Sequence, residues 1–234
     1  MKTFDDAPAI LWAAVRIPET PDPSDLLEPE RTYGLTLRGE RRRREWYAGR
    51  RAARAVLNAL GGPEVTLLPD DEGAPVPAGP NAEGLEVSLT HGASWALCAG
   101  HRRPRGEPHL GIDLVDDADG RRAARVLGRH LTERERALLE ADPDAAALLW
   151  GAREAVAKAT RTGMFAFALL DVAVETLDRA RSTLTVGYPG CDLVFGRWVS
   201  GATLIRARVT EAATAAAQSA AHRRKRGTGT NLNP

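Results

Sequence analysis

The chain has 234 residues, of which 43% are hydrophobic and 27% charged, a composition typical of soluble globular proteins with one large domain or two small ones. Its formal net charge of +1 at pH 7 argues against a general attraction to nucleic acid. No apolar run reaches the roughly 20 residues of a membrane span, and the short run at 7–15 follows two aspartates, the wrong flank for a signal peptide. Cys98 and Cys191 have no metal-ligand spacing, so we expect free buried thiols in the cytoplasm.

The first part of the chain has the pattern of a strand, a long helix and three strands. Residues 10–17 form an apolar run that stops at a proline-rich segment, and residues 40–60 keep helical spacing until Gly61-Gly62-Pro63. A loop rich in aspartate, glycine and proline follows at 69–84. The three shorter strands are expected at 65–68, 85–89 and 95–100.

The second part repeats this order of elements after a segment at 102–108 that has the composition of a linker. Thr132 and Glu135 stand at the positions of a capping box. We therefore expect an α+β fold of two halves, residues 1–105 and 106–221, and a disordered basic tail at 222–234. The helices of the second half are expected at 121–128, 132–140 and 144–160, and its strands at 110–115, 172–177, 181–186 and 197–209.

Lysine is scarce in this chain, which has 29 arginines and three lysines. Lys2 and Lys225 lie near the ends, so Lys158 is the one lysine in the body of the chain. Arginine and lysine differ where a site needs a compact ammonium on a flexible stem. Trp150, Glu154 and Lys158 are spaced four residues apart and line one helix face. The pattern indicates either a surface Glu–Lys pair or part of a reactive site.

An aspartate interrupts the apolar run at 110–115. Asp113 is there either to form a turn or to bind a hard cation. If it faces the helix of Glu154, the two carboxylates converge, and such a pair commonly holds Mg²⁺ with a diphosphate completing the coordination.

Two further segments could bind phosphate. Ser88, Thr90 and His91 place two hydroxyls and an imidazole at the end of a strand, as either a phosphate cradle or a polar hairpin turn. The arginines at 41–54 are either a solvated helix face or contain an anion site.

Four segments in this order resemble the signatures of the Sfp-type 4′-phosphopantetheinyl transferases. They are the arginine-rich helix at 42–50, Ser-Leu-Thr-His-Gly at 88–92, Gly-Ile-Asp at 111–113, and Trp-Gly-Ala-Arg-Glu-Ala-Val-Ala-Lys-Ala at 150–159. The resemblance spans about residues 8–210 and rests on the order and spacing of the segments together.

The resemblance implies a pseudo-twofold pair of α+β halves, each a small, mostly antiparallel sheet packed on a long helix, with coenzyme A bound in the cleft between them. It implies transfer of the phosphopantetheine arm from coenzyme A to a serine of an apo acyl or peptidyl carrier protein, with Mg²⁺, and release of 3′,5′-ADP. The size of the chain, set against the short trimeric members, implies a monomer.

The resemblance also implies roles for three residues of the second half. Asp113 and Glu154 are expected to ligate Mg²⁺, and Glu154 is also expected to take the serine proton, directly or through a water. Lys158 is expected to contact the phosphates and to stabilise charge on the leaving group.

The implied coenzyme A contacts lie in the first half. His91, with Ser88 and Thr90, is expected to bind a phosphate of coenzyme A. Arg42 and Arg50 are expected to face its 3′-phosphate and adenine.

Three positions depart from the family pattern. Val115 stands where many members carry a second acid, Arg153 replaces a common lysine, and Glu72 stands where relatives often have a basic residue. Because of Val115 and Glu72, a second interpretation stays open, in which the chain is a non-catalytic relative that binds coenzyme A or a carrier protein. An arginine-rich nucleic-acid-binding protein is a third alternative, against which stand the near-neutral charge and the aromatic content of 5%.

Overall fold

The computed structural model describes residues 1–197 and 202–227. The chain divides into two compact units, Met1–Arg105 (unit 1) and Gly106–Pro234 (unit 2). Both combine α-helices with antiparallel sheets, so the predicted α+β class is confirmed. Among the described residues, no helix is both long enough and apolar enough to cross a membrane.

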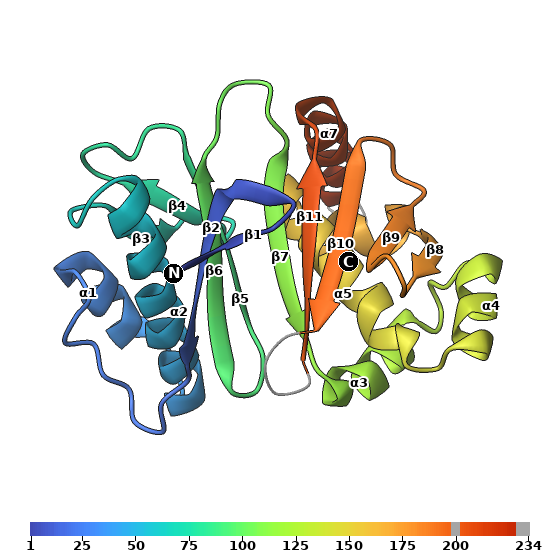
Figure 1. Cartoon of the computed structure of the whole chain (residues 1–234), viewed down its shortest axis with the longest axis horizontal. Helices are drawn as coiled ribbons and strands as arrows, with labels where there is room; N and C mark the ends of the chain where they lie inside the picture. Colours follow the sequence, from blue (N-terminus) through green and yellow to red (C-terminus); the bar gives the residue numbers. More distant parts are fainter. Residues whose placement is uncertain (198–201, 228–234) are drawn as a thin grey trace, which may run out of the picture. The chain divides into compact units, whose positions relative to one another are not determined.

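Unit 1 is a four-stranded antiparallel sheet packed on one long helix (Figure 1). The helix α2 (Glu40–Leu60) contributes Val56 and Leu57, which are fully buried against Val87 and Cys98 of the sheet. The strands lie in the order β1 (Lys2–Phe4), β2 (Ala7–Arg16), β6 (Trp95–Arg102) and β5 (Leu85–His91). The short helix α1 (Glu28–Thr36) and a two-stranded ribbon, β3 (Thr66–Pro69) and β4 (Pro75–Ala78), complete the unit.

Unit 2 is a five-stranded antiparallel sheet packed on the helix α5 (Ala145–Thr160). Its strands lie in the order β7 (His109–Val115), β11 (Thr203–Val209), β10 (Cys191–Arg197), β9 (Thr183–Val186) and β8 (Val174–Asp178). The helix α3 (Asp117–Leu127) packs against α5, and α4 (Glu133–Ala141) contacts both α5 and β8. A π-helical turn, η1 (Met164–Ala168), and the short helix α6 (Leu169–Asp171) follow α5. The last helix is α7 (Glu211–Gly227), labelled in Figure 1.

Two glycines allow α5 to lie unusually close to the sheet of unit 2. A Cβ atom on Gly111 of β7 would overlap the carbonyl oxygen of Ala155 in α5. A Cβ atom on Gly151 of α5 would lie 2.8 Å from Val115 Cγ1 of β7, closer than real Cβ contacts. The absence of both side chains therefore sets the short distance between the strand and the helix.

A buried glutamate ties together three segments of unit 1. Glu30 of α1 is 1% exposed, and its carboxylate accepts two hydrogen bonds of 2.9 Å from Arg54 Nη2 of α2. It also accepts hydrogen bonds from the backbone N–H groups of Leu27, which precedes α1, and of Leu67 in β3. A buried carboxylate is stable only when its oxygens are paired in this way.

Unit 2 contains the same arrangement. Glu135 of α4 is fully buried and pairs with Arg153 Nη2 of α5 at 2.6 Å. Its carboxylate also accepts hydrogen bonds from the backbone N–H groups of Thr132, which caps α4, and of Val174 in β8. The predicted capping box is confirmed, and Arg153 is an internal structural residue.

Most elements match their predicted positions, but several were missed. The strand β4 lies in the predicted loop 69–84. Its two prolines are tolerated because β4 is an edge strand that pairs with β3 in a two-stranded ribbon. The predicted strand 197–209 is in fact the end of β10 and all of β11, separated by residues outside the described part of the chain. The other missed elements are β1, α1, η1, α6 and α7, with most of β10.

The prediction of a disordered tail is wrong for residues 222–227, which continue α7. Ala213, Ala217 and Ala221 recur every four residues along α7 and are buried in the core of unit 2. Arg224, in the predicted tail itself, pairs with Asp171 of α6. The remaining tail residues, 228–234, lie outside the described residues.

Candidate active site

Asp113 and Lys158 meet between β7 and α5. Asp113 is 7% exposed in the strand, so the alternative of a turn-forming aspartate is wrong. Lys158 Nζ lies 2.6 Å from Asp113 Oδ1 and 3.1 Å from the carbonyl oxygen of Ile112. Because side chains alternate along a strand, Gly111, Asp113 and Val115 share the face of β7 that packs on α5.

Glu154 lies one helical turn before Lys158 on α5, and the charges of Lys158 and Asp113 both act on its pKa. Burial raises the pKa of its carboxyl above the ordinary value, and the negative charge of Asp113 adds to this effect. The positive charges of Lys158 and Arg122 act in the opposite direction. The structure pairs Lys158 with Asp113, 45 residues away in sequence, so the alternative of a surface Glu154–Lys158 pair is wrong.

A cavity of about 180 Å³ opens beside Glu154. It is lined by Trp150 and Glu154 of α5 and by Arg122 and Ala123 of α3. The helical spacing of Trp150 and Glu154 places both on the predicted face. No sequence signal singles out Arg122, because its relation to Glu154 depends on how α3 packs on α5.

The two carboxylates are suitable ligands for Mg²⁺. Asp113 pairs with Lys158, which lies one helical turn after Glu154 on α5, and Mg²⁺ in proteins is often held by one or two carboxylates, with waters and phosphate oxygens. Among the described residues, no group of three His, Cys, Asp or Glu side chains is placed to hold a metal. Val115 fills the position of the second family acid and packs, 3% exposed, in the core. A metal here would have two protein carboxylates and would need other ligands.

In unit 1 the three predicted phosphate-binding side chains lie on β5, so the alternative of a hairpin turn is wrong. Ser88 and Thr90 are buried and share one face of the strand, on the side opposite the residues that pack on α2. His91 is exposed at the end of the strand, and its Nε2 lies 3.9 Å from Glu45 Oε2 of α2. The hydroxyls and the imidazole therefore do not form one cluster within β5.

The two candidate arginines of α2 have different environments. Arg42 is exposed, whereas Arg50 is 4% exposed and its guanidinium carbon lies 3.6 Å from the centre of the Trp46 ring. Trp46 in turn stacks on Tyr33 at 4.6 Å between ring centres. Burial lowers the pKa of Arg50 to about 10, which Glu30 partly opposes, and its Nε has no hydrogen-bond partner among the described residues. A guanidinium that is held by stacking on an aromatic ring can bind an anion such as a phosphate.

Comparison with known proteins matches both units to one family. The model of the 4′-phosphopantetheinyl transferase superfamily matches residues 109–215. The model of the 4′-phosphopantetheinyl transferase N-terminal domain matches residues 36–100. The chain belongs to the 4′-phosphopantetheinyl transferase superfamily. The first match contains Asp113, Glu154 and Lys158, the predicted phosphopantetheinyl transferase family is confirmed, and the N-terminal domain match is consistent with the Sfp type.

No protein with a curated description matches the chain. The family assignment therefore rests on the two domain matches, which together include every residue predicted to bind or react.

Proposed function

We propose that the chain is an active transferase that moves the phosphopantetheine arm of coenzyme A to a serine of an apo acyl or peptidyl carrier protein. The observation that supports this most directly is the ion pair of Asp113 and Lys158 between β7 and α5, one helical turn from Glu154. Family membership makes coenzyme A and a carrier protein the expected partners.

The reaction requires a base for the serine hydroxyl. The serine oxygen forms a bond to the β-phosphorus of coenzyme A as the bond from that phosphorus to the bridging oxygen breaks, which releases 3′,5′-ADP. Glu154, which lines the cavity on α5, accepts the serine proton directly or through a water. The cavity beside Trp150 gives the hydroxyl a route to this carboxylate.

The reaction also requires positive charge at the diphosphate. A bound Mg²⁺, held by Asp113 and Glu154, would neutralise part of that charge. Lys158 donates hydrogen bonds to the departing phosphate, where its flexible stem lets the ammonium follow the developing charge. Arg50, stacked on Trp46, binds the phosphate at the nucleotide end.

The test is the mass of apo carrier proteins incubated with the chain, coenzyme A and Mg²⁺. We expect a gain of one phosphopantetheine group on at least one carrier from the fatty-acid, polyketide or nonribosomal-peptide classes. Glu154→Gln should abolish the gain because it removes a metal ligand and the base together. Glu140→Gln, on the exposed side of α4, is the matched control and should transfer like the parent. No gain on any carrier class would refute the proposal.

A second candidate is a relative that binds coenzyme A or a carrier protein without transfer. The burial of Val115 supports it, because the site then has two carboxylates. In that case coenzyme A would raise the melting temperature, since a ligand that binds the folded state stabilises it, but no carrier would gain mass.

A further inference from the structure

The ammonium of Lys158 is held by oxygens of β7. It donates to Asp113 Oδ1 at 2.6 Å and to the carbonyl oxygen of Ile112 at 3.1 Å. The side chains of Lys158 and Asp113 are 29% and 11% exposed, so the pair is largely shielded from water. Charge-assisted hydrogen bonds in such surroundings are stronger than those of exposed ion pairs.

Carboxylate and carbonyl oxygens are also the atoms that a hard cation binds. A metal ion on Asp113 Oδ1 would stand within a few ångströms of the ammonium, and two cations at that distance in a partly buried site repel strongly. Lys158 must therefore leave Oδ1 when a metal binds there. Its aliphatic stem and partial exposure allow that movement.

We propose that Lys158 occupies the metal position on Asp113 in the metal-free protein and that the metal releases it for the diphosphate. This inference rests on the proposed function, because it concerns the same site. The released ammonium is then available to a phosphate, so metal and coenzyme A each favour the binding of the other. Lys158 has two successive partners, Asp113 before the metal binds and the leaving phosphate afterwards.

Direct metal binding tests the competition without any transfer reaction. The affinity for Mn²⁺, measured by electron paramagnetic resonance in the absence of coenzyme A, should rise by about tenfold or more in Lys158→Met, since a competing cation is lost. Lys158→Arg should stay close to the parent because a guanidinium can also pair with Asp113. Arg122→Met is the control for general charge, because Arg122 acts on the charge of Glu154, and it should produce a smaller gain. Asp113→Asn should lose the site.

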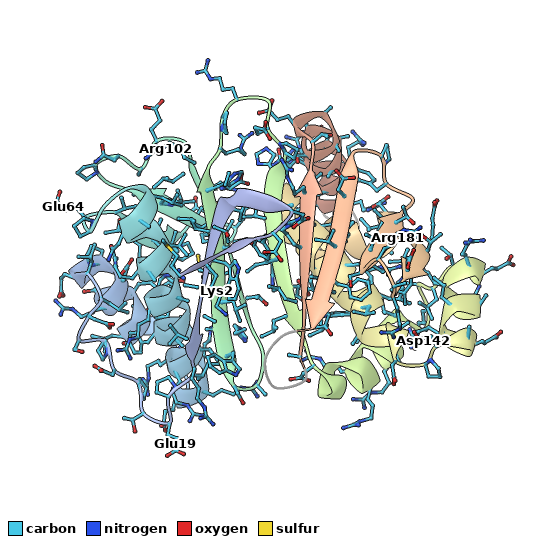
Figure 2. All side chains as sticks on the ribbon, in the orientation of Figure 1. Lys2, Glu19, Glu64, Arg102, Asp142 and Arg181 are labelled. Atoms are coloured by element: carbon cyan, nitrogen blue, oxygen red, sulfur yellow. The ribbon has the colours of Figure 1, made fainter. Side chains whose placement is uncertain are left out.

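The parent protein offers a second measurement, because it has three lysines. Acetylation by a small anhydride, mapped by mass spectrometry, should be slow at Lys158 and should accelerate when Mg²⁺ is added. Coenzyme A added together with Mg²⁺ should protect Lys158 again. Lys2 on β1 (Figure 2), with its Nζ 5.3 Å from the centre of the Trp12 ring, and Lys225 are internal references that should not respond.

Two results would overturn the inference. They are Lys158→Met binding Mn²⁺ no more tightly than Arg122→Met, and Lys158 acetylation that does not change while Mg²⁺ binds. Either could occur in a protein that transfers normally, which would leave the proposed function intact. Conversely, tighter Mn²⁺ binding by Lys158→Met in a protein that modifies no carrier would support the inference and refute the proposed function.

Discussion

At the residue scale, the raised pKa of Glu154 links the protonation of this carboxyl to the stability of the fold. Burial and the charge of Asp113 raise its pKa, so the folded protein holds the Glu154 proton more tightly than the unfolded chain does. The stabilisation from this proton is complete below the unfolded pKa and is lost as pH rises through the folded pKa. Above the folded pKa, the charged carboxylate therefore lowers the stability of the metal-free protein.

Glu154→Gln should accordingly be more stable than the parent above the folded pKa of Glu154, because the amide resembles the neutral carboxyl. The difference should shrink as pH falls toward the ordinary carboxyl range, where the parent also becomes protonated. Urea unfolding in the presence of a chelator, at several pH values, measures this. Glu140→Gln should show no such trend, and a Glu154→Gln advantage that is the same at every pH would contradict the assignment of the raised pKa.

Residue types could be predicted from the sequence better than residue partners. The scarcity of lysine and the spacing from Trp150 mark Lys158 as unusual, but its partner Asp113 is 45 residues away, and only the pairing of β7 with α5 brings them together. Likewise, an arginine-rich helix does not reveal that Arg50 is buried, because all its arginines have the same sequence signal.

At the element scale, the active site depends on how closely β7 approaches α5. Gly111→Ala should destabilise the protein by about 1–3 kcal/mol or more, because the new methyl group would overlap the backbone of Ala155. The forced shift of β7 should also weaken transfer, since Asp113 lies two residues further along the strand. Denaturant unfolding and the carrier assay measure the two effects.

Gly49→Ala in α2 is the matched control for Gly111→Ala. A Cβ atom at Gly49 would meet nothing within 4 Å, so alanine should stabilise the helix by roughly 0.5–1 kcal/mol. Unfolding of Gly111→Ala at the same denaturant concentration as the parent would show that α5 can move away without loss.

Long periodic elements could be predicted closely, and short or unusual ones could not. The helix predicted at 40–60 matches α2 because its apolar spacing and the glycines after it are strong local signals. The prolines of β4 predict a loop, because the local sequence does not show that this segment pairs with β3. In α7, alanine gives a weak apolar stripe whose burial depends on the rest of unit 2.

At the scale of the whole molecule, the two units repeat one topology. In unit 1 the first long strand, β2, pairs with the last, β6, which pairs with β5. In unit 2 the first strand, β7, pairs with the last, β11, which pairs with β10. The sequence predicts this repeat from element order, and the twofold relation between the units stays a prediction.

The buried glutamates strengthen the case for an internal repeat. Glu30 and Glu135 each stand in the first turn of a short helix, and each pairs with an arginine from the long helix of its unit, Arg54 or Arg153. These pairs were not predicted, because a glutamate in a first helical turn is usually an exposed cap. Their equivalence suggests that the same substitution in either unit has the same local result.

We expect Glu30→Ala and Glu135→Ala each to lose about 3–5 kcal/mol of stability, because each leaves an arginine without its carboxylate, Arg54 in a largely buried position and Arg153 in a fully buried one. Each should also speed amide hydrogen exchange at two equivalent positions, Leu27 and Leu67 in unit 1 or Thr132 and Val174 in unit 2.

Nuclear magnetic resonance can follow these amides one by one. Asp178→Ala, which removes the exposed pair with Arg181, is the control and should leave exchange at all four unchanged (Figure 2 labels Arg181). If Glu135→Ala exposes its two amides while Glu30→Ala exposes neither, the carboxylates are not equivalent. The repeat would then be one of strand order alone. Matching losses in both units would instead show that the buried ion pair belongs to the repeated unit, together with the helix and strand that it joins.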